Sequence, residues 1–286
     1  MERLTLITKP QSTYELIDSG GEEKLERFGD VVLSRPDPQA LWPKSLSQEW
    51  VKTNGVYVNE GKEGGKWTGN IPKEWPIDFG RLKMVIKPTS FKHTGLFPEQ
   101  LPNWEWMSSI LTAKPRAKVL NLFAYTGGAT LAAAKAGAEV THVDGSKSAV
   151  AWARENAAAS ELEDKPIRWI VEDVLTFVTR EIKRGNKYDA IIMDPPAFGH
   201  GPKSEIWKIE ENFVELVGLC KQLLSEKPLF VLINGYAEGY SPLAFAQNLT
   251  DLSKKYGGKV QCGELTIAES QSDRLLPAGI FARWQA

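Results

Sequence analysis

The stretch Lys118–Asp144, KVLNLFAYTGGATLAAAKAGAEVTHVD, constrains the fold of this chain more than any other segment. Its apolar run, 119–123, has the length and composition of a buried parallel strand. A glycine turn then leads into an alanine-rich helix, 129–136, and a second strand follows that ends at Asp144. Strand, glycine turn, helix, strand and acid form the opening unit of an open α/β sheet.

The rest of the C-terminal part continues this alternation. Further strands are expected at 167–171, 190–193 and 229–233, and further helices at 146–160, 174–184, 205–225 and 242–256. No helical segment separates the last two expected strands, 259–267 and 279–284, so they are expected to pair antiparallel. The pattern predicts a doubly wound, Rossmann-like α/β sheet with an antiparallel hairpin at one edge.

The first part of the chain has a different character. Alternating segments and glycine turns, beginning with a hairpin over 14–28, predict a small β-rich N-terminal domain at 1–90, before an α/β domain at 91–286. Six of the ten tryptophans fall within the first 106 residues. Large side chains would give a small sheet its core, and stacking on nucleobases is the alternative use for them.

Composition excludes several classes of protein. With 42% hydrophobic and 25% charged residues, the chain resembles an ordinary globular protein, and a net charge of −1 gives no overall attraction to nucleic acid. One local strip, Arg81, Lys83, Lys87 and Lys92, is interpreted as a solvated strand face, with phosphate contact as the alternative. No segment has the length of a bilayer span, and two cysteines and three scattered histidines form no metal pattern. We therefore expect a cytoplasmic protein that needs neither a membrane nor a metal.

The glycine turn and the acid after the second strand indicate an adenine nucleoside as ligand. Glycines allow the backbone to approach such a ligand, and the acid accepts hydrogen bonds from ribose hydroxyls. The dinucleotide pattern Gly-x-Gly-x-x-Gly is incomplete, because Thr126 and Leu131 stand where its first and third glycines belong. The turn therefore disfavours an NAD(P)-dependent oxidoreductase.

A second turn, Asp194-Pro195-Pro196, follows the strand expected at 190–193. Two prolines hold the backbone extended and remove two N–H donors, so their carbonyl groups are expected to be free to accept hydrogen bonds. Such a turn suits a nucleophile that donates hydrogen bonds, such as an amino group. His200 follows closely, either as a general base or as an exposed loop residue.

Four segments, NLFAYTGG, THVDGSK, EDV and IIMDPPAFGHG, resemble the motifs of class I S-adenosylmethionine-dependent methyltransferases. Within that class the chain is most similar to the group that contains the large-subunit ribosomal RNA cytosine-5 methyltransferases. The likeness extends from roughly Phe91 to Trp284. It includes Lys92–Gln100, which in that group helps to cover the cofactor, whereas the group's RNA-binding PUA module has no recognisable counterpart.

The resemblance implies a role for each matching residue. The methionine part of S-adenosylmethionine would contact Asn121, Phe123, Tyr125, Thr126 and Gly127, and the ribose would bond to Asp144, with Gly145 and Ser146 beside it. Asp173 would accept from the adenine amino group, with Val174 against the ring. Asp194, Pro195 and Pro196 would face the sulfonium methyl group and the nucleophile, and Gly95, Phe97 and Gln100 would close over the cofactor. Asp173 as an N-cap, Asn121 as a partner of buried backbone and Tyr125 as a packed ring are the structural alternatives.

One departure from the resembling group concerns cysteine. Cytosine-5 methylation needs a thiolate nucleophile, which that group carries in the loop after the fifth strand. Here the corresponding segment, 234–239, reads NGYAEG, and both Cys220 and Cys262 fall in segments with the pattern of core elements. We therefore expect direct methyl transfer to a nitrogen or oxygen atom. RNA is the expected acceptor by resemblance; a small-molecule or protein acceptor and a non-catalytic module that keeps the cofactor fold are the alternatives.

Overall fold

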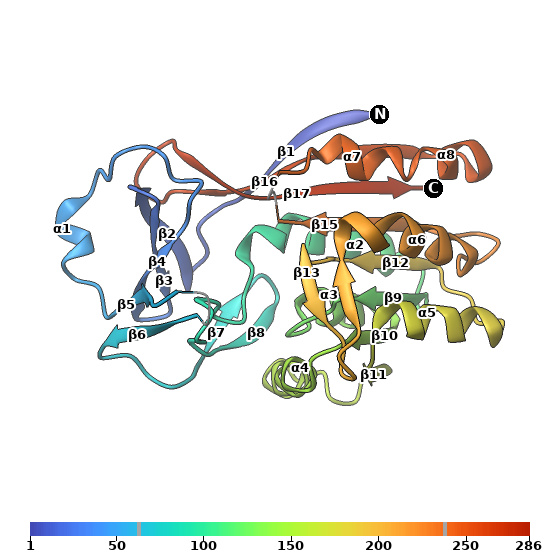
Figure 1. Ribbon diagram of the computed structural model, residues 1–286, viewed down its shortest axis with the longest axis horizontal. Coiled ribbons are helices and arrows are strands. Elements are labelled where there is room, and N and C mark those ends of the chain that lie inside the picture. The colour runs from blue at the N-terminus through green and yellow to red at the C-terminus, as the bar shows by residue number, and fades with distance from the viewer. Residues whose placement is uncertain (62–63, 237–238) are drawn as a thin grey trace. The chain divides into compact units, whose positions relative to one another are not determined.

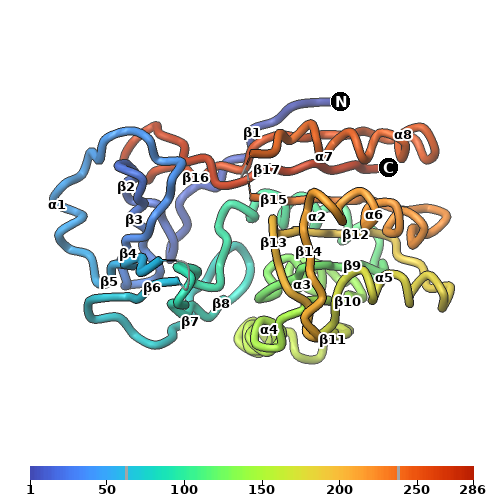
Figure 2. Tube along the Cα trace, viewed as in Figure 1, coloured from blue at the N-terminus to red at the C-terminus, as the bar shows by residue number. Residues whose placement is uncertain are grey.

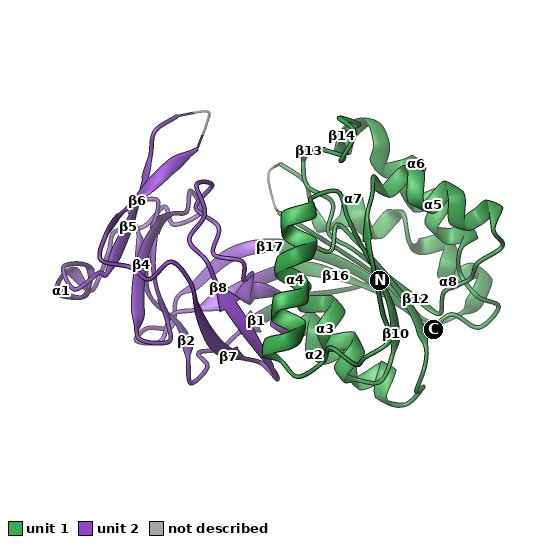
Figure 3. Cartoon of the chain, turned by 90° about the horizontal axis from the view of Figure 1, so that it is seen from below, with its two compact units in different colours: residues 1–6, 102–264, 279–286 green, residues 7–101, 265–278 purple. Residues whose placement is uncertain are grey.

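The structure is a computed structural model of the chain, and it describes residues 1–61, 64–236 and 239–286. The chain forms two compact units (Figure 3), of which unit 1 comprises Met1–Leu6, Pro102–Glu264 and Gly279–Ala286, and unit 2 comprises Ile7–Leu101 and Leu265–Ala278. This division differs from the expected 1–90 and 91–286, because the first residues belong to unit 1 and the turn between the last two strands belongs to unit 2.

An eight-stranded sheet in the order β1-β16-β17-β15-β12-β9-β10-β11 forms the framework of unit 1 (Figure 1). The five strands β9, β10, β11, β12 and β15 run parallel, and β17 runs antiparallel to β15. The chain builds outward from β9 in one direction and from β12 in the other, so the order reverses between these two neighbours. The bounds are β1 (Glu2–Thr8), β9 (Lys118–Leu122), β10 (Glu139–Asp144), β11 (Ile167–Val171), β12 (Ala190–Met193), β15 (Phe230–Gly235), β16 (Lys259–Ala268) and β17 (Leu275–Gln285).

Helices cover both faces of this sheet (Figure 3). On one face lie α2 (Leu101–Thr112), α3 (Gly128–Lys135) and α4 (Lys147–Ala159); on the other lie α5 (Val174–Lys183), α6 (Ile209–Gln222), α7 (Pro242–Gln247) and α8 (Thr250–Tyr256). Leu120 and Leu122 of β9 join the hydrophobic core beneath α5–α8. The doubly wound α/β architecture expected from the sequence is confirmed. Among the described residues, no helix has the length and apolar character needed to cross a membrane.

Three elements differ from those expected. The helix expected at 205–225 begins only at Ile209, because β14 (Ile206–Lys208) pairs antiparallel with β13 (Phe198–His200) in a hairpin that leads into α6 (Figure 2). The helix expected at 242–256 is two helices, α7 and α8. The edge of the sheet is β1 rather than the closing hairpin, and Gly263 permits this, since a Cβ atom there would lie 1.7 Å from the carbonyl oxygen of Leu4.

Unit 2 is β-rich, as expected. It contains a five-stranded sheet, β2-β3-β4-β5-β6, and a separate ribbon of β7 and β8. Of the basic strip, Arg81 and Lys83 are exposed, whereas Lys87 and Lys92 are half-buried. Lys83 pairs with Asp78 at 3.3 Å and Lys87 with Glu74 at 3.2 Å, which favours the structural interpretation over phosphate contact. The bounds are β2 (Tyr14–Gly20), β3 (Glu23–Phe28), β4 (Val31–Pro36), β5 (Gly55–Asn59), β6 (Gly65–Gly69), β7 (Trp75–Phe79) and β8 (Leu82–Ile86), with the short helix α1 at Ser47–Trp50 and a 3₁₀ turn, η1, at Pro98–Gln100.

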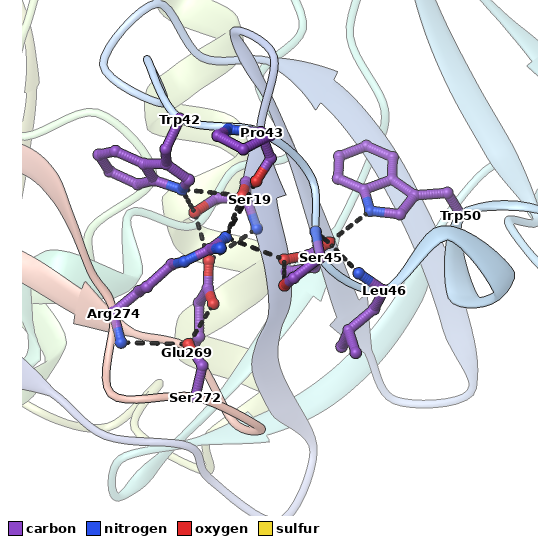
Figure 4. Close-up of polar contacts among 10 residues, drawn as sticks. Ser19, Trp42, Pro43, Ser45, Leu46, Trp50, Glu269, Ser272 and Arg274 are labelled. Atoms are coloured by element: carbon purple, nitrogen blue, oxygen red, sulfur yellow. Dashed lines mark hydrogen bonds and ion pairs between the residues drawn. The ribbon is translucent and has the colours of Figure 1, made fainter.

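A buried polar cluster ties the segment around α1 to the sheet of unit 2 (Figure 4). The carboxylate of Asp18 accepts hydrogen bonds from the hydroxyl of Ser45 (2.8 Å) and the indole N–H of Trp50 (2.8 Å). Beside it, the Ser19 hydroxyl donates to Glu269 at 2.6 Å. Both acids are buried, and these donors offset the cost of removing them from water.

The tryptophans of unit 2 belong to its packing. Each indole N–H donates to a partner within the unit, as an amphipathic ring does when half-buried. The pairs are Trp42 with the Ser19 carbonyl, Trp50 with Asp18, Trp67 with the Thr89 carbonyl and Trp75 with the Phe28 carbonyl. These contacts favour the core interpretation of the rings over base stacking.

Candidate functional site

The candidate site of unit 1 lies where β9 and β12 end. These two strands are parallel neighbours, with Leu122 opposite Met193. In an open α/β sheet, ligands bind outside the carboxyl ends of the strands at the point where the strand order reverses. The loops after β9, β10, β11 and β12 all reach this edge, and they carry the acids Asp144, Asp173 and Asp194.

The loop from β9 into α3 has an unusual backbone. Phe123, Tyr125 and Gly127 have φ angles of +53°, +48° and +87°, in the left-handed region that most L-residues avoid. Such strain persists only where other bonds hold the loop. The N–H of Ala124 donates to the Val143 carbonyl at 3.1 Å, which fastens the loop to the neighbouring strand β10.

Asp144, at the end of β10, is held by two backbone groups. Its Oδ2 accepts from the N–H of Tyr125 and its Oδ1 from the N–H of Ser146, each at 2.8 Å. Burial raises the pKa of Asp144 and the two donors lower it, with a net upward shift. Each carboxylate oxygen accepts more than one hydrogen bond. The carboxylate is therefore held in one orientation and retains capacity to accept from two adjacent hydroxyl groups.

The two adjacent glycines of this loop serve different purposes. Gly127 supplies a positive φ and a close approach to α4, because a Cβ atom there would lie 3.0 Å from the Cβ of Ala153. At Gly128 a Cβ atom would lie 2.2 Å from the indole ring of Trp104 on α2. The space at Gly128 is thus filled by a helix of the protein itself, and only Gly127 belongs to the strained loop.

Asn121 belongs to a buried polar chain beneath the loop. Its amide nitrogen donates to Oγ1 of Thr130 at 2.9 Å, and that oxygen lies 2.9 Å from Nδ1 of His142. Burial lowers the pKa of His142 to about 3, so the imidazole is neutral at physiological pH. Asn121 therefore bonds to a side chain, and not to buried backbone as the structural alternative expected. Thr130 and His142 were not singled out from the sequence, since nothing in the local pattern marks a helix residue as facing a strand residue.

Asp173 and Val174, which are expected on the adenine side, lie at the start of α5. Asp173 is the N-cap, and its Oδ1 accepts from the N–H of Thr176 at 2.9 Å, while Val174 is buried. The capping alternative is therefore observed. It does not exclude a second acceptor role, because one capping bond uses only part of the capacity of a carboxylate.

The Asp194-Pro195-Pro196 turn follows β12. Burial raises the pKa of Asp194 to about 6. The carbonyl of Pro196 is not free as expected, because the indole N–H of Trp207 donates to it at 2.7 Å. Trp207 is buried, and its ring meets Phe123 edge-on with the centroids 4.8 Å apart. Trp207 thus links the turn after β12 to the strained loop after β9. This role was not predicted, because the sequence placed Trp207 inside a helix expected at 205–225.

The tip of the β13–β14 hairpin lies beside Gly145 and Asp173. A Cβ atom on Gly145 would lie 3.3 Å from the carbonyl oxygen of His200, and one on Gly201 would lie 3.1 Å from the Cβ of Asp173. The side chain of His200 is exposed, with its ring 4.9 Å from that of Phe198. The hairpin therefore approaches both Gly145 and Asp173, at the ends of β10 and β11.

The three expected cover residues belong to the other unit, and the loop after β15 is described only in part. Gly95, Phe97 and Gln100 belong to unit 2, where Gln100 is buried and the ring of Phe97 packs against His93, and their role in covering a cofactor stays a prediction. In the loop after β15, residues 237–238 lie outside the described part, and Tyr240 stacks on Phe245 as a loop anchor.

Neither cysteine lies in a reactive environment. Cys220 packs in the core beneath α6 and Cys262 in β16, and burial raises the pKa of both thiols. A buried thiol with a raised pKa has little thiolate at neutral pH. Within the described ranges, no group of three or more His, Cys, Asp or Glu side chains is arranged to hold a metal ion.

Comparison with known proteins identifies the family. Residues 103–262 match the family model described as "Conserved hypothetical protein 95". A crystal structure described as the SAM-dependent methyltransferase from Agrobacterium tumefaciens is 37% identical, covers 99% of this chain and 95% of that one, and superposes with a TM-score of 0.94.

Two curated relatives carry ribosomal RNA names. "Ribosomal RNA large subunit methyltransferase K/L" of Shewanella sp. (strain MR-4) is 33% identical over 221 residues, which are 73% of this chain and 28% of that protein. "Ribosomal RNA large subunit methyltransferase I" of Aeromonas salmonicida is 34% identical over 167 residues, which are 56% of this chain and 39% of that protein. The chain thus spans well under half the length of either relative.

Proposed function

The chain belongs to the S-adenosylmethionine-dependent methyltransferases and to the family described as conserved hypothetical protein 95, and from this premise we propose that it methylates RNA of the large ribosomal subunit by direct transfer, without a cysteine nucleophile. The observation that carries the proposal is the pair of half-buried acids Asp144, at the end of β10, and Asp194, directly after β12, on the two strands that flank β9. One acid is oriented by backbone donors for a ribose, and the other begins the rigid turn at which a nucleophile would be held.

The residues of unit 1 fit S-adenosylmethionine. When bound, this cofactor supplies an electrophilic methyl group on a sulfonium centre. Asp144 offers its two fixed oxygens to the ribose hydroxyls, with Gly145 and Ser146 beside it, and Asp173 and Val174 offer an acceptor and an apolar surface to the adenine. The methionine part is assigned to the strained loop and the strand before it, that is to Asn121, Phe123, Tyr125, Thr126 and Gly127.

Asp194 is assigned to the nucleophile. An N–H group of an acceptor base can donate to its carboxylate, which would hold the nitrogen lone pair in the direction of attack. As the bond from nitrogen to the methyl carbon forms, the bond from that carbon to sulfur would break and leave its electron pair on sulfur, and the carboxylate would take the proton from nitrogen. Pro195 and Pro196 keep the turn extended, and the bond from Trp207 to the Pro196 carbonyl fixes its far end. Positioning of this kind needs no covalent enzyme–base adduct.

Two observations support the cysteine-free part of the proposal. Cys220 and Cys262 are both buried, and burial raises the pKa of each thiol. Segment 234–239 contains no cysteine, whereas the corresponding segment of the cytosine-5 group carries the nucleophile. RNA as acceptor is supported by the names of the two curated relatives, which this chain matches over part of their length.

The test is transfer of tritiated methyl groups from S-adenosylmethionine into RNA from cells that lack this protein. We expect label in ribosomal RNA that ribonuclease releases and protease does not, and no label with Asp144→Ala. Nucleoside analysis of the labelled RNA then identifies the methylated atom. Label that is released by protease alone, or that stays in small molecules, would refute RNA as the acceptor while leaving the methyl-donor assignment intact.

A further inference from the structure

The β13–β14 hairpin has two faces of different character. In its antiparallel register Phe198 lies opposite Lys208, Gly199 opposite Trp207 and His200 opposite Ile206. Paired residues of an antiparallel ladder point to the same side, and successive residues alternate. Gly199 and Trp207 therefore share an inner face, and four residues share an outer face: Phe198, His200, Ile206 and Lys208.

The inner face fixes the orientation of the hairpin. Trp207 is buried, donates to the Pro196 carbonyl at 2.7 Å and packs against Phe123. The N–H of Ile209, which follows the hairpin, donates to the carbonyl of Ala197 at 3.0 Å. Because both strands are anchored next to the Asp194 turn, the outer face has a fixed orientation beside that turn.

The outer face exposes large apolar side chains. Phe198 is 55% exposed and Ile206 is 60% exposed, and His200 is also exposed, with its ring perpendicular to that of Phe198 at a centroid distance of 4.9 Å. A single exposed apolar residue is ordinary, but an aromatic ring, an imidazole and an isoleucine on one face of a short ribbon form a patch that marks a contact surface.

The chemistry of this patch favours single-stranded RNA over a protein partner. Stable protein interfaces bury roughly 800 Å² on each side, which is far more than these four side chains offer. Unstacked bases need only a planar ring, and aromatic and imidazole side chains supply it in RNA-binding proteins.

The outer face itself carries one cation and no acid, and the acids near the hairpin are Glu205 in its turn and Glu210 and Glu211 at the start of α6. Lys203 lies at its tip and Lys208 at its base. The carboxylate of Glu205 accepts from the N–H of Lys203 at 2.8 Å, within the turn. Lys208 pairs with Glu211 at 2.7 Å on the surface, where such a pair contributes little and a phosphate can replace the carboxylate.

We propose that the outer face of the β13–β14 hairpin stacks with the unpaired bases that flank the methylated nucleotide. Phe198 is the main platform, four residues after Asp194, and His200 adds a second ring at right angles to it. This proposal rests on the proposed RNA methyltransferase function. It names the surface that holds the RNA strand next to the Asp194-Pro195-Pro196 turn.

Three substitutions at Phe198 test the proposal. Phe198→Ala removes the ring, Phe198→Leu keeps apolar bulk without a ring, and Phe198→Trp keeps a ring. With a fluorescein-labelled 15-nucleotide oligouridine as probe and labelled ribosomal RNA as substrate, we expect Phe198→Ala and Phe198→Leu to raise the Kd for the probe and the KM for RNA roughly 5- to 150-fold. Phe198→Trp should restore both values to within about threefold, the remainder that an imperfect fit of the larger ring would leave.

The matched control is Val214→Ala on α6, which truncates another exposed apolar side chain (71% exposed) in the same unit and should leave both values unchanged. Calorimetric affinity for S-adenosylhomocysteine should be the same in all variants, which shows that each is folded. If Phe198→Leu restores the KM as well as Phe198→Trp does, the patch is a general apolar contact and base stacking is refuted.

Unchanged RNA affinity and KM in Phe198→Ala would refute the hairpin proposal alone, provided that the wild-type protein methylates RNA. Absence of any RNA methylation by the wild-type protein would refute the proposed function, and the hairpin proposal with it. The two failures are therefore distinguishable in one set of assays.

Discussion

The two acids of the candidate site, Asp144 and Asp194, hold the same position in the topology but differ in how they are held. Each ends a buried parallel strand at the carboxyl edge of the sheet, and burial raises the pKa of each. Asp144 is fixed by two backbone N–H donors at 2.8 Å, whereas the pKa of Asp194 reaches about 6. Asp144 is thus oriented by the backbone for a ligand. Asp194 has a pKa close to physiological pH, which suits a group that takes up a proton.

The largest effect is expected from Asp144→Ala. It removes an acceptor of two ligand hydroxyls, and hydrogen bonds to a charged group contribute about 1.5–3 kcal/mol each, so affinity for S-adenosylhomocysteine should fall roughly 100-fold or more. Isothermal titration calorimetry measures this loss. The control is Glu139→Ala at the opposite end of the same strand, where the acid bonds to Arg116 on the surface. A loss of less than about threefold for Asp144→Ala would contradict the nucleoside assignment.

The pH dependence of methyl transfer should report Asp194. Because burial raises its pKa to about 6, the carboxylate becomes protonated below that pH, and kcat should fall about tenfold for each further pH unit. Asp194→Asn should lower kcat roughly 100-fold at pH 8 and lose this acid limb. The affinity for S-adenosylhomocysteine should change little. An unchanged acid limb in Asp194→Asn would assign the limb to another group.

Asp194→Asn should lower kcat but raise the stability of the folded protein. The folded-state pKa of Asp194 lies above its ordinary value of 3.8, so ionisation costs folding free energy as the pH rises through about 6. Asparagine removes this cost, and the free energy of unfolding at pH 8 should rise by about 1–2 kcal/mol, as measured by urea denaturation. A variant that is less stable at pH 8 would show that the ionised carboxylate has a structural role.

A smaller effect is expected from Trp207→Phe, which keeps a ring against Phe123 and loses the N–H donated to the Pro196 carbonyl. One hydrogen bond contributes about 1 kcal/mol, so kcat should fall roughly three- to tenfold while cofactor affinity is retained. The matched control is Trp284→Phe, which loses the same type of bond, to the Gly257 carbonyl at 2.9 Å, elsewhere in unit 1. Equal losses of kcat in both variants would mean that Trp207 acts through general stability alone.

The smallest effect on turnover is expected from replacing both cysteines, Cys220 and Cys262, with alanine. Neither thiol takes part in the proposed reaction, so methyl incorporation should stay within about twofold of the wild type. The melting temperature should fall by a few degrees, because small buried cavities each cost about 1 kcal/mol. A covalent adduct with RNA that contains 5-fluorocytidine would contradict direct transfer. It would show that the enzyme uses a cysteine adduct, as the cytosine-5 methyltransferases do.

Local sequence patterns predict much of the framework. The parallel strands appear in the sequence as short continuous apolar runs, because both of their faces are buried. Chain order then places their carboxyl ends at one edge, which locates Asp144, Asp173 and Asp194 together. The motifs around these acids are also sufficient to recognise the methyltransferase class, since residues that touch a shared cofactor recur in a fixed order.

Contacts between distant residues could not be predicted in this way. The bond from Tyr125 to Asp144, the filling of Gly128 by Trp104 and the bond from Trp207 to Pro196 all join different elements or loops, and no local pattern encodes which of these lie side by side. The β13–β14 hairpin was missed because its few residues carry a weaker periodic signal than the helix that follows them. Local sequence thus specifies the strands and the acids that end them. Tertiary packing decides how each acid is held, because hydrogen-bond partners and burial depend on what the rest of the chain brings alongside.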